Sequence, residues 1–165
     1  MKFPYYLFLL IELFVVAYYD LKEKKISNNW IILNSLVFLL VCMREPQHYW
    51  LFNTIIYFSL TLIIGFILFN FNIMGAGDSK YLAFFFILIP EPYRLEFLNN
   101  LLLVTIIVAS YLIFYHSIKF RKEIMIYLKT KYYIKILKLY GFKFAYAPII
   151  LLSWIYLGWN VFQTK

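Results

Sequence analysis

Long apolar runs separated by short polar segments dominate the chain. The runs are Phe3 to Tyr19, Trp30 to Met43, Trp50 to Asn70, Tyr81 to Pro90 with its flanks, Leu101 to Tyr115, and Ala145 to Phe162. A helix needs about 20 apolar residues to cross the hydrocarbon core of a bilayer, so we expect the shorter runs to borrow flanking residues or to thin the membrane. The pattern predicts an all-α polytopic membrane protein with about six transmembrane helices.

The composition excludes a soluble globular domain. Of the 165 residues, 64% are hydrophobic and 15% are charged, whereas soluble domains have roughly 45–50% and about 25%. Six spans would use most of the chain, so residues 1–165 are expected to form one integral-membrane domain. The single cysteine, Cys42, excludes an intrachain disulfide and a cysteine-based zinc site, and no cofactor or metal site is predicted.

The first apolar run is expected to remain in the mature protein. It has only Lys2 as a basic leader, carries Glu12 in its middle, and ends in Ala17-Tyr18-Tyr19 without the small residues of a cleavage site. We therefore interpret it as a retained helix rather than as a secretory signal.

Lysine and arginine residues set the expected orientation, because cytoplasmic loops hold the excess of both. Twelve of the sixteen lie in the first, third and fifth connecting segments, and four lie on the other side: Lys2, Arg44, Arg94 and Lys165. The asymmetry predicts that both termini lie outside and that the odd loops lie in the cytoplasm. Trp30, Trp50, Trp154 and Trp159 fall near the predicted interfaces, where amphipathic rings are favoured.

Much of the net charge of +8 lies between residues 116 and 143, where basic residues alternate with isoleucines and leucines. A basic amphipathic segment next to a span is typical of a helix that lies on anionic phospholipid at the cytoplasmic leaflet, so no nucleic-acid partner is expected. The alternative is that this segment grips a substrate.

The two aspartates fall at the same predicted membrane edge. Asp20 ends the first helix and Asp78 opens the fourth, so both would lie at the cytoplasmic boundary and could meet across a helix bundle. Two adjacent carboxyls share a proton, which suits the attack of a bridging water on a peptide carbonyl. The alternative is that each is an ordinary interfacial residue, with Asp78 capping its helix.

Two glycines precede Asp78. Gly75 and Gly77 allow a backbone with positive φ and a close approach of another chain, such as an extended peptide. A glycine-rich turn before a capped helix would explain the same four residues. A phosphate cradle is disfavoured, because the longer glycine pattern is missing and an acid occupies the place of the anion.

Three segments together resemble the type IV prepilin peptidases, membrane aspartic proteases of the Gly-x-Gly-Asp class that include the preflagellin peptidases. Residues 20–28 are similar to the first motif, an Asp followed six residues later by Ile-Pro-Asn, with Ser27 in place of the proline. Residues 75–80, Gly-Ala-Gly-Asp-Ser-Lys, are similar to the second. Residues 144–149 look like the segment that opens the last helix.

The resemblance implies that Asp20 and Asp78 are the catalytic pair, with Gly75, Gly77, Lys80 and Asn28 in supporting positions. It also implies prepilin-like substrates of type IV pilus, tight-adherence or secretion systems, cut between a short basic leader and the apolar helix that follows. Longer members carry a cysteine-rich segment and methylate the new N-terminus. This chain lacks that segment, so a peptidase-only enzyme of the prokaryotic plasma (inner) membrane is expected.

Other polar residues have alternative interpretations. Glu12 is expected to be neutral or hydrogen-bonded inside the bundle, because it lies about 80° around the helix from Asp20. Lys80 either tunes the aspartates or meets lipid phosphate, and Asn28 either caps the second helix or orients Asp20. Gly65 is a candidate contact point for a substrate helix.

The main rival to the peptidase is a non-enzymatic membrane scaffold or transporter-like subunit of a pilus or secretion system. Such a protein would use Asp20 and Asp78 as helix caps or along an ion path. A peptidase needs both carboxyls within reach of one water, whereas a scaffold would tolerate their separate replacement.

Overall fold

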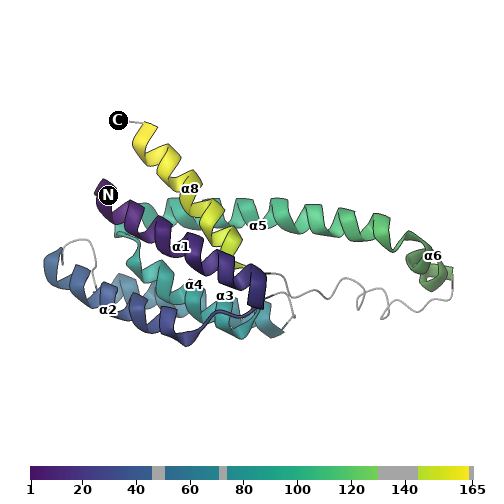
Figure 1. Cartoon of the computed structure of the whole chain (residues 1–165), viewed down its shortest axis with the longest axis horizontal. Helices are drawn as coiled ribbons and strands as arrows, with labels where there is room; N and C mark the ends of the chain where they lie inside the picture. The colour runs from purple at the N-terminus through teal and green to yellow at the C-terminus, as the bar shows by residue number, and fades with distance from the viewer. Residues whose placement is uncertain (46–50, 71–73, 130–144, 164–165) are drawn as a thin grey trace.

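A computed structural model describes the chain except for residues 46–50, 71–73, 130–144 and 164–165. The described helices are α1 (Phe3–Glu23), α2 (Asn28–Arg44), α3 (Leu51–Asn70), α4 (Ala76–Leu88), α5 (Glu91–Lys119), α6 (Arg121–Lys129) and α8 (Ala147–Gln163). No strand occurs among these residues, and the predicted all-α class is confirmed. Figure 1 shows α1 to α5 and α8 as a bundle, with the last half of α5 and α6 extending beyond it.

Five helices of the bundle are apolar enough to lie in a membrane. The segments Phe3–Glu23, Phe52–Asn70 and Glu91–Lys119 are long enough to cross one, and Asn28–Arg44 and Ala147–Gln163 are shorter apolar helices. Large apolar side chains cover the outer faces of these helices, as a lipid-facing surface requires. Together with the predicted spans, this describes an integral membrane protein.

Helix α4 differs from its neighbours because it is surrounded by protein. Nine of its thirteen residues are buried, and it packs against α2 and α3. A helix that is covered on every side needs no polar face, which explains why its sequence shows no amphipathic periodicity. The short fourth run of the sequence is thus the centre of the bundle.

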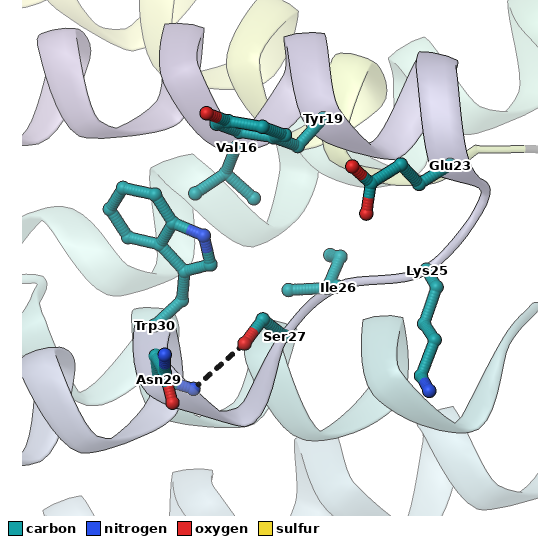
Figure 2. Close-up of a pocket in the computed structure, with 8 residues that line it drawn as sticks. All are labelled: Val16, Tyr19, Glu23, Lys25, Ile26, Ser27, Asn29 and Trp30. Carbon is teal, nitrogen blue, oxygen red and sulfur yellow. Dashed lines mark hydrogen bonds between the residues drawn. The ribbon is translucent and has the colours of Figure 1, made fainter.

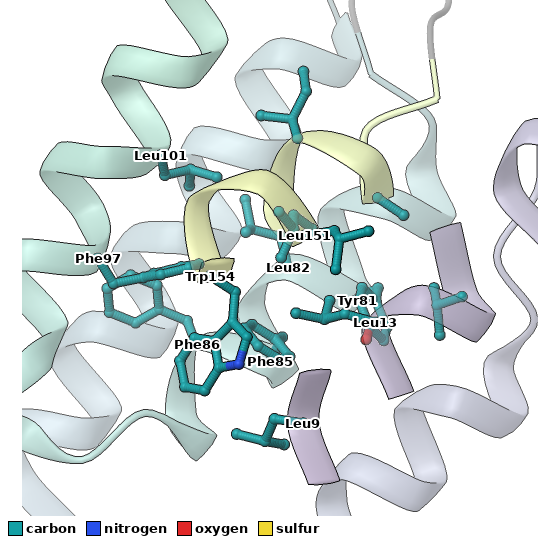
Figure 3. Packing of buried hydrophobic residues seen from close by; sticks show 14 of the residues in the cluster. Leu9, Leu13, Tyr81, Leu82, Phe85, Phe86, Phe97, Leu101, Leu151 and Trp154 are labelled. Atoms are coloured by element: carbon teal, nitrogen blue, oxygen red, sulfur yellow. The ribbon is translucent and has the colours of Figure 1, made fainter. Parts of the chain in front are cut away.

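The core is built from aromatic side chains of α4, α5 and α8 together with leucines of α1 (Figure 3). The ring of Trp154 lies 5.4 Å from that of Phe85 and 6.0 Å from that of Phe97, edge to face in both pairs. The sequence placed Trp154 at a membrane interface, but its side chain is fully buried. It packs in the core because its indole N–H finds the carbonyl of Tyr6 at 3.3 Å.

Small residues allow the closest helix contacts. A Cβ on Gly65 would lie 2.8 Å from the Cβ of Ser79, and the Ser79 hydroxyl donates a hydrogen bond to the Gly65 carbonyl at 2.9 Å. Gly65 was a candidate contact point for a substrate helix, but Ser79 of α4 occupies the space where a side chain at this position would lie. This contact fixes the start of α4 against α3.

Helix α5 begins ten residues before its predicted start. Polar residues in its first turns interrupt the apolar pattern, among them Arg94, which is completely buried. The guanidinium donates to the Ile89 carbonyl at 2.8 Å and to the Thr54 hydroxyl at 3.0 Å, and lies 5.7 Å from the centre of the Tyr57 ring. Arg94 was predicted in an outer loop, and this burial corrects that placement.

The basic segment predicted at 116–143 is described only in part. Its first residues complete α5, and Arg121 to Lys129 form the short helix α6. The remainder, from residue 130, lies outside the described residues.

Candidate active site

Asp20 lies in the last turns of α1, and its side chain is 1% exposed. One carboxylate oxygen, Oδ2, accepts a hydrogen bond of 3.0 Å from the backbone N–H of Ala147, the first residue of α8. A carboxylate is favoured there because the first N–H groups of a helix have no partner within it and carry partial positive charge. The other oxygen, Oδ1, is buried without a hydrogen bond to any described residue.

Asp78 lies in the first turn of α4 and is 4% exposed. Its Oδ2 accepts a hydrogen bond of 3.2 Å from the N–H of Gly75, the residue that precedes the helix. This is half of a capping box, in which an acid at the third helical position bonds back to the helix start. The capping role that we considered for Asp78 is therefore present, and it leaves Oδ1 without a hydrogen bond to the described residues.

The connection between α1 and α2 brings the two aspartate segments together. A Cβ on Gly77 would lie 3.0 Å from the carbonyl oxygen of Ile26, the buried residue of this connection, so only a glycine lets the connection lie so close to the start of α4. The residue before Asp78 thus lies against the connection that follows α1, which places the segments that carry Asp20 and Asp78 next to each other. Each carboxyl is fixed through one oxygen by a backbone N–H at the start of a helix.

A sharp turn ends α1 at Glu23, three residues after Asp20. Lys24 adopts the left-handed conformation, with φ at 51°, and its N–H donates to the Asp20 carbonyl at 2.8 Å. The turn sends the chain back along the bundle toward α2. Ser27 then caps α2, since its hydroxyl accepts a hydrogen bond from the Asn29 N–H at 3.3 Å.

The supporting residues expected from the sequence lie at different distances from the pair. Gly75 and Gly77 form the backbone of the site. The close approach expected there is present at Gly77, but the positive φ expected from the sequence is wrong, because no described glycine has one and the φ of Gly75 is −75°. Asn28 is the first residue of α2 and is exposed, so the cap that was favoured for it belongs to Ser27. Lys80 is exposed and forms no ion pair with the described part of the chain.

The start of α8 is the part of the site that the residue pattern did not reveal. Tyr146, just before Ala147, is buried, and its hydroxyl lies 2.9 Å from that of Thr105 on α5, which in turn donates to the Leu101 carbonyl at 2.6 Å. These bonds fix the N–H that holds Asp20. The resemblance pointed to residues 144–149. A backbone N–H, however, is present in every residue type except proline, so no residue type in the sequence marks this donor.

Glu12 belongs to a separate polar cluster deeper in the bundle. Its Oε1 accepts a hydrogen bond of 3.0 Å from the hydroxyl of Tyr81. The side chain of Asn34 on α2 is also buried, and neither atom of its amide has a hydrogen-bond partner among the described residues. The hydrogen-bonded role expected for Glu12 is confirmed. Because Tyr81 follows Asp78 by three positions, the cluster lies one helical turn from the carboxyl pair along α4.

A pocket of about 310 Å³ opens between the end of α1 and the start of α2 (Figure 2). It is lined by Val16, Tyr19 and Glu23 of α1, by the connecting residues 25–27, and by Asn29 and Trp30 of α2. The carbonyl of Ile26, one of the lining residues, is the group that approaches Gly77. The pocket is therefore adjacent to both aspartate segments.

Among the described residues, no three histidine, cysteine, aspartate or glutamate side chains gather as metal ligands. His48, which the sequence placed on the opposite side from His116, lies outside the described residues. The chemistry available at the site is that of two buried carboxyls, each with one oxygen fixed by a backbone N–H and one oxygen without a hydrogen bond to the described residues.

One comparison with known proteins finds a family. The model of the type IV leader peptidase family matches residues 7–118, a range that includes both aspartate segments and ends before α8. No curated protein and no solved structure matches the chain.

Proposed function

Because the chain belongs to the type IV leader peptidase family, we propose that it is an aspartic endopeptidase whose catalytic pair is Asp20 and Asp78. Its substrates are prepilin-like membrane proteins, and it removes their short basic leader at the cytoplasmic face of the prokaryotic plasma membrane. The observation that carries this proposal is the approach of two buried carboxyls from distant segments, each anchored by a helix N-terminus.

The proposed mechanism is that of a shared-proton pair. Two neighbouring carboxyls hold one proton between them, because both cannot ionise cheaply. The ionised member takes a proton from a water as the water oxygen attacks the scissile carbonyl carbon, and the protonated member donates to the developing oxyanion. Collapse of the tetrahedral intermediate then breaks the C–N bond, and a proton passes to the leaving amine.

The location of the pair at one end of the bundle supports a leader peptidase in particular. A precursor with a basic leader followed by an apolar helix would place its junction at a membrane interface, with the leader in the cytoplasm. Asp20 and Asp78 lie where α1 ends and α4 begins, which is the end of the bundle predicted to face the cytoplasm. The junction and the carboxyl pair would then lie at the same depth.

The experiment that tests this function is a cleavage assay in membranes. The parent chain and the double variant Asp20→Asn/Asp78→Asn are each produced with a single-span precursor that carries a short lysine-containing leader. We expect the parent to release a product whose mass and new N-terminus place the cut between leader and apolar helix, and the double variant to release none. Equal processing by both chains would favour the scaffold or transporter-like alternative.

A further inference from the structure

The pocket between the end of α1 and the start of α2 combines an acid with two aromatic rings. Figure 2 shows the Glu23 carboxylate directed toward the space between the rings of Tyr19 and Trp30 and the backbone at Ile26 and Ser27. The Lys25 side chain runs away from that carboxylate in the same view. A carboxylate together with the faces of tyrosine and tryptophan is a chemistry that binds an ammonium or guanidinium group.

Glu23 is also the accessible negative charge nearest to the carboxyl pair. Asp20 and Asp78 are buried, whereas Glu23 is exposed and forms no ion pair with the described residues. The surrounding connection carries Lys22, Lys24 and Lys25, and the chain as a whole has a net charge of +8. A cationic segment of substrate would be repelled over most of this surface and attracted at Glu23.

The distance from the carboxyl pair to the pocket suits a peptide that binds both. Glu23 follows Asp20 by three residues on α1, a rise of about 4.5 Å, and extended peptide spans about 3.3 Å per residue. With the reach of the side chains added, a residue two to four positions from the scissile bond would enter the pocket.

We propose that this pocket is a specificity site in which Glu23, with the rings of Tyr19 and Trp30, binds one lysine or arginine side chain of the substrate leader. The inference rests on the proposed peptidase function and adds to it a position and a chemistry of recognition. It assigns Glu23 to substrate binding and leaves bond cleavage to Asp20 and Asp78.

The test varies one charge on each partner. Precursors with a single leader lysine two, three or four residues before the cut, and matched precursors with glutamine there, are processed by the purified full-length chain. The enzyme forms are the parent, Glu23→Gln, and the control Glu123→Gln, which removes the same charge from an exposed position on α6. A non-ionic detergent excludes lipid ammonium groups as a competing occupant.

We expect Glu23→Gln to raise KM about three- to tenfold for the precursor with lysine at the matching position, and to leave kcat within about twofold. Glutamine precursors should show the same KM with the parent and Glu23→Gln, and Glu123→Gln should change neither. The variant Glu23→Lys should recover binding of a precursor that carries glutamate at the matching position. A KM that is unchanged by Glu23→Gln, or raised equally for lysine and glutamine precursors, would overturn the proposal.

Peptide binding separates this proposal from the proposed function. A fluorescent leader peptide with the matching lysine is titrated onto the Asp20→Asn/Asp78→Asn chain with and without Glu23→Gln. The peptide could bind more tightly when Glu23 is present while the parent chain cleaves no precursor. That result would support the specificity site and contradict the peptidase function. Cleavage and binding that are both independent of Glu23 would support the peptidase and contradict the pocket.

Discussion

Backbone N–H groups, rather than side chains, hold the two acids in place. Asp20 accepts from Ala147 at the start of α8, and Asp78 accepts from Gly75 at the start of α4. Both donors are at helix N-termini, where a carboxylate is stabilised by the unpaired N–H groups and by the helix dipole. The geometry of the pair therefore depends on where these two helices begin.

Replacement of Ala147 tests the donor to Asp20 directly. Ala147→Pro removes the N–H at the first position of α8, where proline is compatible with a helix start, whereas Ala147→Gly keeps it. We expect the proline variant to lose at least about tenfold in kcat/KM, as a charge-assisted hydrogen bond of roughly 1.5–3 kcal/mol would require. Precursor cleavage at matched protein levels measures it, and equal rates for the proline and glycine variants would contradict the assignment.

Gly77 is the residue whose missing side chain lets the α1–α2 connection approach Asp78. A Cβ in Gly77→Ala would lie 3.0 Å from the Ile26 carbonyl oxygen, so this connection must move. We expect a larger loss of cleavage than in the neighbouring control Ala76→Ser, which adds an atom at an exposed position. Parental activity of Gly77→Ala would show that the approach is not needed for catalysis.

The sequence identified the aspartates and glycines of the site, but not the backbone groups that hold them. Two aspartates and two glycines were identified because their types are rare in an apolar chain. The Ala147 donor and the cap at Ser27 were not, because both depend on where a helix begins, and helix ends are weakly specified by local sequence. The approach of Asp20 to α8 spans 127 positions and had no local signal.

Among the helices, α4 holds the site together because it is the one enclosed by the others. Its first turn carries Asp78, and Tyr81 on the next turn bonds to Glu12 of α1. Sequence periodicity identified this segment as apolar, and Asp78 was expected to open the helix, which in the structure begins two residues earlier at Ala76. The enclosed position of α4 depends on packing by α2 and α3, which periodicity within α4 itself does not encode.

The Glu12–Tyr81 bond connects α1 and α4 one turn below the carboxyl pair. Tyr81→Phe leaves the buried Glu12 carboxyl without its donor, so the free energy of unfolding should fall by about 1–3 kcal/mol. Glu12→Gln keeps an acceptor and should have a smaller effect. Thermal unfolding in detergent measures both, and a double-mutant cycle with no coupling between the two positions would show that the bond contributes nothing.

The contact between α1 and α8 is fixed by a missing side chain. The Tyr6 ring lies where a Cβ on Gly158 would be, with its hydroxyl 2.1 Å from that point, and Tyr6 stacks on Trp154. Gly158→Ala should therefore destabilise the protein by about 1–3 kcal/mol through displacement of the ring. In a Tyr6→Leu background the same substitution should have little effect, and an equal loss in both backgrounds would contradict this packing.

For the whole molecule, opposite ends of the bundle have different chemistry. Lys2 forms an ion pair with Glu45, and the N-terminal amine donates to the Tyr93 hydroxyl at 2.6 Å, so the N-terminus, the end of α2 and the start of α5 share one end. Asp20, near the end of α1, and Asp78, at the start of α4, lie at the other end. From that end α5 extends toward α6 (Figure 1). Apolar runs were enough to predict the helical membrane class, but not which helix the others enclose.

The distribution of lysine and arginine leads to a topology that labelling can test. With Cys42 replaced by alanine, Lys25→Cys should react with a membrane-impermeant maleimide only after intact cells are permeabilised. Arg44→Cys, at the other end of α2, should react in intact cells. Labelling in the reverse order would place the acids outside and contradict a cytoplasmic site.

If Asp20 and Asp78 act as one catalytic pair, as proposed, substitution of either one alone removes the function of both. Rates of precursor cleavage are measured for Asp20→Asn, Asp78→Asn and the double variant, with membrane levels and thermal unfolding matched to the parent. Since residues that act as a unit are not additive, each single variant should lose activity by at least about a thousandfold and the double variant should be no worse. Cleavage at the parental rate by either single variant would show that the two carboxyls do not act as a catalytic pair.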